Sequence, residues 1–326
     1  MTANKTPVYQ TKEVREFEKL AAERLCINGD TLMSRAGKAA YELLLKRWPH
    51  AKRIAVFCGG GNNGGDGYVL AGLLHDRGAA VMVCQVGDHT KLKAEALHAK
   101  ERCEQSGVPM QAFHPDIDLQ YPDVIVDAIC GIGIKEDLRG DATEAVSYMN
   151  GLPTPVLAID IPTGIEADTG RLLGSVVKAD ATMTFIGMKL GLITGSGSSY
   201  AGEVTLNDLQ LPAEIFTYVK PVAEKIELDA FDAYLLPRLK DWHKGLSGHV
   251  LVIGGSPGFS GAPAMAGMAA LRVGAGLVTV ATHIENASAM DAENPELMCH
   301  GIHDAEGLKP LLEKADVVVL GPGWFF

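Results

Sequence analysis

The stretch Gly59-Gly60-Gly61-Asn62-Asn63-Gly64-Gly65-Asp66-Gly67 decides the fold of this chain. The apolar run Arg53–Cys58 leads into it, and valine and leucine residues at helical spacing follow it. This order predicts a buried strand, a glycine-rich loop and the start of a helix. Because glycine has no Cβ, backbone N–H groups of such a loop can approach an anion, which the helix dipole also favours. We interpret the stretch as a phosphate-binding loop; a merely flexible turn is the alternative.

Composition limits the class of protein. The chain has 326 residues, 47% of them hydrophobic but only 6% aromatic, with a net charge of −11. This size allows two domains, and the aliphatic composition is typical of α/β proteins with buried parallel strands. So acidic a chain without a basic run argues against binding to nucleic acid or to an anionic membrane surface.

Several features indicate the compartment. The six cysteines include no CxxC pair, the N-terminus has no apolar signal core, and no window approaches 18 uninterrupted apolar residues. We therefore expect a cytoplasmic protein that uses its cysteines as small core residues, and we expect it to form a homo-oligomer.

Strand and helix patterns then alternate along the chain. Thr11 and Asp30 are the expected N-caps of two helices that precede the first strand. Strong strands are predicted at residues 53–58, 80–86, 123–127 and 156–160, and possible edge strands at 181–186 and 203–206. Repeated strand–helix units predict a Rossmann-like, doubly wound parallel sheet with two N-terminal helices. In such a sheet, ligands bind beyond the carboxyl ends of the strands.

A second unit follows a junction near residues 210–230. Its charged segment Glu224–Glu227 is interpreted as a linker, so we place one domain at residues 1–222 and another at 223–326. In the second domain, strand 249–253 enters another glycine loop, and strand 316–320 ends at the turn Gly321-Pro322-Gly323. Only three residues follow that turn, so we expect a truncated α/β domain.

Polar side chains gather where the strands of the first unit end. Asp127 and Asp160 close two strands, Thr163 follows shortly after, and Asn63 lies in the glycine loop. Oxygen-only ligands suit a hard cation rather than zinc, and a carboxylate there could serve as an acid or base. The alternative for each aspartate alone is that it caps the next helix.

The glycine stretch also matches the dinucleotide fingerprint formally, as Gly59-x-Gly61-x-x-Gly64. Asp88 lies near the position expected for a ribose-binding acid. A lone match of this kind is a weak signal, and the Asn62-Asn63 pair is unlike an ordinary Rossmann turn. No Gly-Lys-Ser/Thr follows, which excludes a Walker P-loop.

Three motifs together resemble a known family. They are GGGNNGGDG at 59–67, Val126-Asp127-Ala128-Ile129 with its glycine turn, and IDIPTGIEADTG at 159–170. These motifs, over residues 10–215, resemble the YjeF N-terminal family, the NAD(P)H-hydrate epimerases. Residues 244–276 with Gly321-Pro322-Gly323 resemble the start of an ADP/ATP-dependent NAD(P)H-hydrate dehydratase, a ribokinase-like fold.

The resemblance implies repair of NADHX and NADPHX, in which the nicotinamide ring is hydrated. The epimerase interconverts their R and S epimers, and the dehydratase removes water from the S form with ADP or ATP. It further implies a potassium ion held by Asn63, Asp127 and Thr163. Asp160 and Lys189 are the expected catalytic residues. The substrate would contact Asn62, Asn63, Gly64, Gly65, Asp66, Gly131, Ile132, Gly133, Ile134, Lys135, Glu136, Asp137 and Asp160, together with Ala262 and Gly323 of the second unit.

The chain departs from the dehydratase pattern after Gly323, because the late nucleotide loop of that family is not present. We therefore expect no dehydratase activity from these residues. Two alternatives to the epimerase remain: a nicotinamide-dependent oxidoreductase, and a non-enzymatic dinucleotide-binding module.

Overall fold

Seven parallel strands form the central sheet of the first of two units, which comprise residues 1–232 and 233–326. The computed structural model describes residues 5–90, 92, 94–228, 231, 241–293 and 295–324. The strands lie in the order β4 (Met110–Ala112), β3 (Ala80–Gln85), β2 (Arg53–Cys58), β5 (Val124–Ala128), β6 (Val156–Ile159), β7 (Ala181–Phe185) and β9 (Glu203–Asn207). From β2 the chain adds β3 and β4 on one side, and then β5, β6, β7 and β9 on the other side, so the topological switch point lies between β2 and β5.

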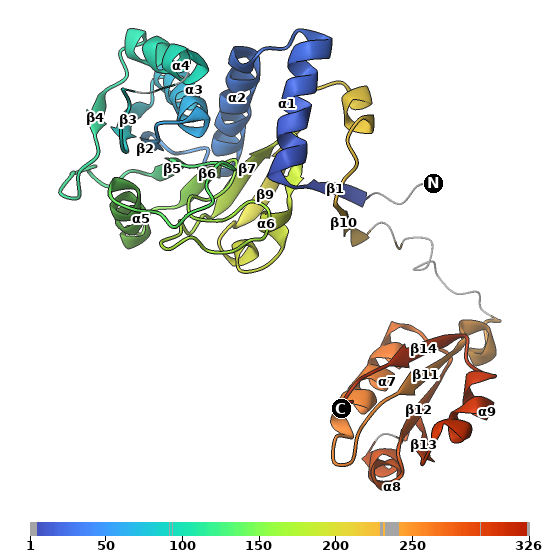
Figure 1. Ribbon diagram of the computed structural model, residues 1–326. Coiled ribbons are helices and arrows are strands. Elements are labelled where there is room, and N and C mark those ends of the chain that lie inside the picture. The colour runs from blue at the N-terminus through green and yellow to red at the C-terminus, as the bar shows by residue number, and fades with distance from the viewer. Residues whose placement is uncertain are drawn as a thin grey trace. The chain divides into compact units, whose positions relative to one another are not determined.

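Helices cover both faces of this sheet (Figure 1). One face packs against α1 (Thr11–Leu25), α2 (Gly29–Arg47), α3 (Asn62–Asp76) and α4 (Ala94–Gln105). The other face packs against α5 (Asp141–Gly151). Val56 of β2 faces the first group and Phe57 faces the second, as the two-residue period of a strand requires. The doubly wound α/β fold is therefore confirmed.

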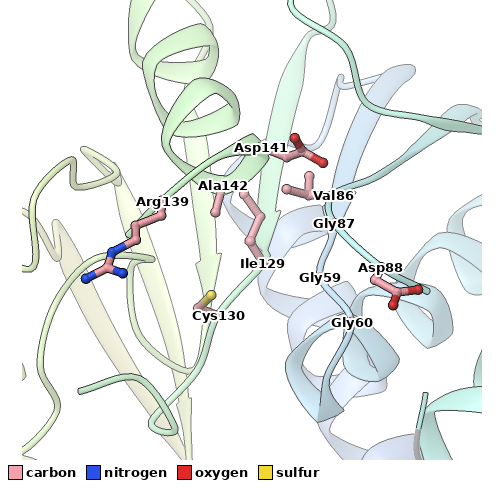
Figure 2. A pocket seen from close by; sticks show the side chains of 10 residues that line it. All are labelled: Gly59, Gly60, Val86, Gly87, Asp88, Ile129, Cys130, Arg139, Asp141 and Ala142. Carbon is pink, nitrogen blue, oxygen red and sulfur yellow. The ribbon is translucent and has the colours of Figure 1, made fainter. Parts of the chain in front are cut away.

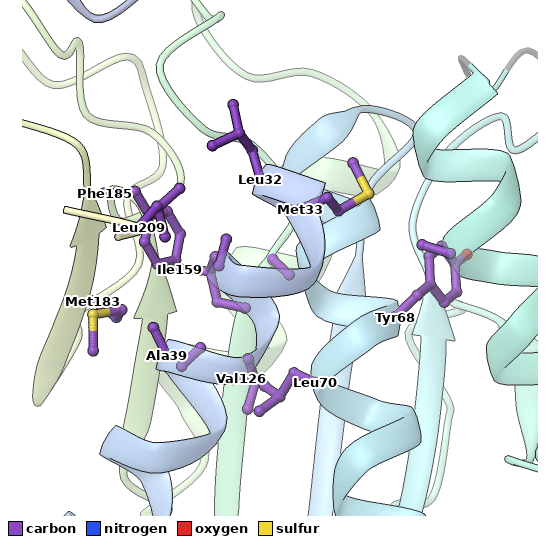
Figure 3. Packing of buried hydrophobic residues seen from close by; sticks show 14 of the residues in the cluster. Leu32, Met33, Ala39, Tyr68, Leu70, Val126, Ile159, Met183, Phe185 and Leu209 are labelled. Carbon is purple, nitrogen blue, oxygen red and sulfur yellow. The ribbon is translucent and has the colours of Figure 1, made fainter. Parts of the chain in front are cut away.

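The larger of the two cores lies under α2 and α3. Figure 3 shows their side chains packed over Val126 and Ile159 of the sheet, both of which are fully buried. Because the inner strands β2 and β6 are covered on both faces, their sequences are nearly continuous apolar runs rather than alternating ones.

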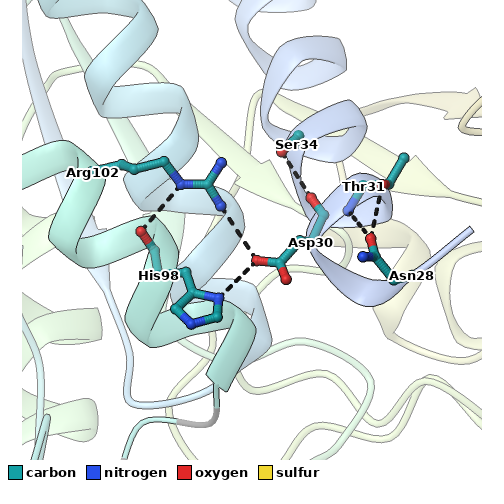
Figure 4. A network of polar contacts seen from close by, with 6 residues as sticks. All are labelled: Asn28, Asp30, Thr31, Ser34, His98 and Arg102. Atoms are coloured by element: carbon teal, nitrogen blue, oxygen red, sulfur yellow. Dashed lines mark hydrogen bonds and ion pairs between the residues drawn. The ribbon is translucent and has the colours of Figure 1, made fainter.

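Both predicted helix caps are wrong. Thr11 is the first residue of α1, whose N-cap is Gln10, and the Thr11 N–H donates to Asp168 Oδ1 at 2.6 Å. Asn28 caps α2 by accepting from the Thr31 N–H at 2.9 Å. Asp30 instead joins α2 to α4. Its Oδ1 lies 3.2 Å from His98 Nδ1 and 3.3 Å from Arg102 Nη2 (Figure 4).

A small second sheet corrects the linker prediction. It has the order β10 (Ala223–Ile226), β1 (Lys5–Tyr9) and β8 (Met188–Lys189). β1 pairs antiparallel with β10 and parallel with β8, with Tyr9 opposite Lys189. Most of the segment expected as a linker is therefore a strand, at residues 223–226. This strand belongs to the first unit, although the predicted boundary lies between residues 222 and 223. Residues 229 and 230 of the predicted junction lie outside the described residues.

The sheet differs from the sequence prediction in two further details. β7 is an inner strand, paired with β6 and β9, whereas β9 does lie at the edge. The short strand β4, which was not predicted, forms the opposite edge of the sheet. A short helix, α6 (Leu190–Ile193), follows β8 directly.

The second unit has a parallel sheet of its own. Its order is β13 (Met298–Ile302), β12 (Leu277–His283), β11 (His249–Ile253) and β14 (Val317–Leu320). Its helices are α7 (Gly261–Val273), α8 (Ile284–Glu293) and α9 (Lys309–Leu312). The predicted strands at 249–253 and 316–320 are thus confirmed. Within the described ranges, no helix combines the length and apolar character needed to cross a bilayer.

Candidate functional site

A buried carboxylate and a hydroxyl form the base of the candidate site, at the carboxyl ends of the strands. Asp127 lies near the end of β5 and is fully buried. Its Oδ2 accepts from the Thr163 N–H at 2.7 Å, and its Oδ1 accepts from Thr163 Oγ1 at 2.7 Å. Burial raises the pKa of Asp127 to about 6, against the lowering effect of these hydrogen bonds and one from Ile129.

Asn63 lies beside this base without a hydrogen-bond partner among the described residues. It is 8% exposed, yet neither its Oδ1 nor its Nδ2 has a partner there. A Cβ built at Gly131 would stand 3.4 Å from Asn63 Oδ1 and 3.2 Å from Asp160 Oδ2. The three predicted residues Asn63, Gly131 and Asp160 therefore meet. Because buried polar groups are almost always satisfied, the free amide of Asn63 indicates a place for a ligand.

Asp160 and Lys189 form a buried ion pair across two strained turns. Lys189 Nζ lies 2.5 Å from Asp160 Oδ1 and also donates to the Phe185 carbonyl at 2.7 Å. Asp160 has a φ of +65°, and the Ile161 N–H donates back to the Ile159 carbonyl at 2.8 Å. Ile186 adopts the same φ in the equivalent turn after β7. Left-handed backbone at non-glycine residues is concentrated at functional sites.

Two further carboxylates share this electrostatic environment. The pKa of Asp66 is raised well above its ordinary value by burial and then by the charges of Asp160 and Glu18, with Lys189 opposing. The pKa of Glu18 is raised by burial and then by Asp160, while Lys189 and Arg15 lower it. Sequence reasoning missed Glu18 on α1, because a glutamate on an amphipathic helix carries no local signal of this role.

The glycine loop serves both packing and access. A Cβ at Gly59 would stand 2.0 Å from the Ile129 carbonyl oxygen, so only glycine lets the β2 and β5 loops approach this closely. Gly64 and Gly65 are also enclosed, whereas a Cβ at Gly61 would meet no atom within 4 Å. Gly61 is the N-cap of α3, and because glycine has no side chain it cannot accept a hydrogen bond from the first turn of the helix. The first N–H groups of α3 can therefore bind an anion.

A cavity of about 410 Å³ adjoins the loop at the switch point (Figure 2). Gly59, Gly60 and Ile129 line it, and Asp88 and Arg139 lie on opposite sides of it. Asp88 Oδ1 accepts from the N–H and the hydroxyl of Thr90, at 2.9 and 2.5 Å. The carboxylate predicted for a ribose therefore takes part in a local turn.

The remaining residues predicted to contact the substrate lie in two regions, one in each unit. Asn62 is exposed at the start of α3, and the loop from Gly131 to Asp137 is partly or fully exposed. In the second unit, Ala262 and Gly323 are neighbours, because a Cβ at Gly323 would stand 3.4 Å from Ala262 Cβ. The Ser256 N–H donates to the Gly323 carbonyl at 2.9 Å, which pairs the two glycine turns.

Two family models match the chain. Residues 29–191 match the model for YjeF-related protein N-terminus, and residues 250–324 match the model for NAD(P)H-hydrate dehydratase. The two matches lie in different structural units.

Curated relatives agree with this division. A protein of Coxiella burnetii named bifunctional NAD(P)H-hydrate repair enzyme is 45% identical over 98% of this chain, and the match covers 65% of that protein. The corresponding Escherichia coli protein is 37% identical, with 61% of its length covered. The chain thus spans slightly less than two thirds of these bifunctional relatives. A Legionella pneumophila protein named NAD(P)H-hydrate epimerase is 38% identical over 69% of this chain and 86% of its own length.

A solved structure supports the fold. The crystal structure of yeast YNL200c matches 68% of this chain and 98% of its own, with a TM-score of 0.57 at 21% identity. This likeness concerns the fold; the family model and the Legionella relative place the chain in the YjeF-related family of NAD(P)H-hydrate epimerases.

Proposed function

We propose that the first unit interconverts the R and S epimers of NADHX and NADPHX. The observation that carries the proposal is the Asp160–Lys189 ion pair beside the unpartnered amide of Asn63. Family membership supports the reaction class, and the local geometry provides groups that can carry it out. The hydrated nicotinamide ring would lie against Asp160, whose Oδ2 is directed toward Gly131.

Asp160 would act as acid and base at the hydrated carbon. Lys189 holds Oδ1 at 2.5 Å, which leaves Oδ2 for the substrate. The Lys189 ammonium is 1% exposed, so its charge acts in a poorly hydrated environment. It would stabilise the Asp160 carboxylate after that group gives up its proton. General acid–base catalysis of this kind contributes about 10²–10⁴-fold to a rate.

The oxygen donors at the base of the site fit a potassium ion. Asn63 offers a buried Oδ1 without a partner, and Asp127 and Thr163 add a carboxylate and a hydroxyl. This donor set is hard, and its single carboxylate can balance the charge of a monovalent cation. When bound, the ion would offset negative charge of Asp127 and of the substrate phosphates. The start of α3 at Asn62 would contact one of those phosphate groups.

The second unit is proposed to contribute the dehydratase function of a bifunctional protein, with ADP or ATP. Its match to the dehydratase model supports this role, and Ala262 and Gly323 are its proposed ligand contacts. An assay of the S epimer with ADP or ATP tests whether residues 1–326 perform that step; our expectation is no turnover.

The deciding experiment for the first unit uses separated epimers. Each epimer of NADHX is incubated with the protein, with and without potassium, and the R/S ratio is followed by chromatography. Approach to one common ratio from both sides supports the proposal. An unchanged ratio would reject it, and hydride transfer to a second substrate would instead favour the oxidoreductase alternative.

A further inference from the structure

A second cavity, of about 320 Å³, lies beside the N-terminal half of α1. We call it the α1 basic cavity. The helix contributes residues at spacings of three and four, which lie on one face. The lining residues are Thr11, Lys12, Arg15, Glu16, Lys19, Lys135 and Asp168.

The lining is cationic in an acidic protein. Four lysine and arginine side chains face two carboxylates, although the whole chain carries 29 basic and 40 acidic residues. One of the two carboxylates is already engaged, because Asp168 Oδ1 accepts from the Thr11 N–H at 2.6 Å. Among the described residues, no ion pair neutralises Lys12, Lys19 or Lys135. The cavity therefore has an excess of positive charge without a protein partner.

Two elements connect this cavity with the candidate site. The loop after β5 contributes Lys135 to the cavity and Gly131 to the contact with Asp160. α1 contributes Arg15 to the cavity and Glu18 to the electrostatic group around Asp160. The same loop and the same helix thus contribute residues both to the α1 basic cavity and to the surroundings of Asp160.

The loop that carries Lys135 is held at two points. Arg171 Nη2 donates to the Lys135 carbonyl at 3.4 Å, and the Leu138 N–H donates to the Leu173 carbonyl at 3.0 Å. The backbone is therefore anchored at Lys135 and three residues beyond it, so less conformational entropy is lost when the loop binds a ligand.

We propose that the α1 basic cavity binds a phosphate group of the dinucleotide substrate, a role that rests on the proposed function. Lysine and arginine bind phosphate through charge-assisted hydrogen bonds, and the guanidinium of Arg15 can bind two phosphate oxygens at once. The phosphate has two possible sources in this substrate. The 2′-phosphate occurs only in NADPHX, whereas the pyrophosphate occurs in both NADHX and NADPHX.

The test compares two double variants that remove equal charge. Lys12→Gln/Lys19→Gln alters the cavity, and Lys38→Gln/Lys46→Gln alters two exposed positions on α2 as the control. KM is measured for both substrates with each variant. We expect the cavity variant to raise KM about 100-fold relative to the control, because two charge-assisted hydrogen bonds are lost. An increase for NADPHX alone identifies the 2′-phosphate, and an equal increase for both identifies the pyrophosphate. Equal KM values in the two variants would overturn the proposal.

A direct titration separates this proposal from the proposed function. Adenosine 2′-monophosphate and inorganic pyrophosphate are titrated into the wild type and both variants by calorimetry. Binding of one probe that weakens only in the cavity variant supports the site even if the wild type shows no epimerisation. If neither probe distinguishes the cavity variant from the control, the cavity does not bind phosphate.

Discussion

The Lys189 ammonium links two turns that share a left-handed φ of +65°, one at Asp160 after β6 and one at Ile186 after β7. It donates to Asp160 Oδ1 at 2.5 Å in the first turn and to the Phe185 carbonyl at 2.7 Å in the second. Tyr9 of β1 pairs with Lys189, which fixes the backbone from which the side chain extends. The pair therefore depends on both sheets of the first unit.

Substitution of Asp160 by asparagine should remove activity but keep the fold. Asparagine tolerates the left-handed φ of +65° at this position and preserves the size of the side chain. Loss of the acid and base should lower kcat for epimer exchange by about 10²–10⁴-fold. The control is Asp160→Ala, which should also lower the thermal midpoint, because alanine is strained at positive φ. Undiminished exchange in Asp160→Asn would reject the catalytic assignment.

Removal of the lysine should destabilise the first unit. In Lys189→Met the Asp160 carboxylate and the Phe185 carbonyl lose their shared donor in a buried setting. We expect a loss on the order of 3 kcal/mol in the free energy of unfolding, measured in urea. The double variant with Asp160→Asn should recover part of this loss, because no unpaired carboxylate remains. Strictly additive losses would show that the pair is not coupled.

The hydroxyl of Thr163 should matter for both stability and potassium. Thr163→Val removes the donor to Asp127 Oδ1 and the acceptor of the Cys130 N–H. Leaving these buried groups unsatisfied should cost about 2 kcal/mol. The concentration of potassium that gives half-maximal epimerisation should also rise. Thr163→Ser keeps the hydroxyl and is the matched control. A potassium requirement equal in all three proteins would exclude Thr163 as a ligand.

Substitution by alanine should destabilise the protein at one glycine of this loop and leave its stability nearly unchanged at another. A methyl group at Gly59 would collide with the Ile129 carbonyl oxygen, whereas one at Gly61 would meet nothing within 4 Å. Gly59→Ala should therefore cost on the order of 3 kcal/mol through overpacking. Gly61→Ala should leave the thermal midpoint nearly unchanged, since its extended backbone accepts any residue. Equal midpoints for the two variants would contradict the close approach of these loops.

Ionisation of Asp66 should make the folded protein less stable as the pH rises. The pKa of its carboxyl in the folded protein lies well above the ordinary 3.8, because burial and nearby Asp160 disfavour the charged form. The folded state therefore holds this proton more tightly than the unfolded state does. Its ionisation lowers stability as the pH rises above 3.8, and the loss is complete above the folded pKa.

Asp66→Asn cannot ionise, so it should gain stability over the wild type as the pH rises from 3.8 towards the raised pKa of the folded state. Thermal midpoints of both proteins across that range give the measurement. Asp76→Asn, at the far end of α3, is the control. A constant difference between Asp66→Asn and the wild type would show that the carboxyl titrates normally.

The errors of sequence interpretation have identifiable physical causes. Asp30 has the right chemistry for a cap, but Asn28 takes the cap position and Asp30 turns to His98 and Arg102 on α4. The charged run Glu224–Glu227 resembles a linker, yet residues 223–226 pair with β1 as an exposed edge strand. In each case a contact distant in sequence decided between two locally acceptable structures.

The sequence by itself determined the parallel sheet, because the buried strands at 53–58, 124–128 and 156–159 are mainly apolar and have glycine or aspartate at or next to their carboxyl ends. It also placed Asn63, Asp127, Asp160 and Thr163 at one edge, since parallel strands end together. Only the tertiary structure decided which groups touch. Lys189 reaches Asp160 across 29 residues because β8 pairs with β1, and Glu18 comes close to it because α1 follows that strand. Local periodicity encodes secondary structure, whereas the distances between side chains of the site depend on how the separate elements pack.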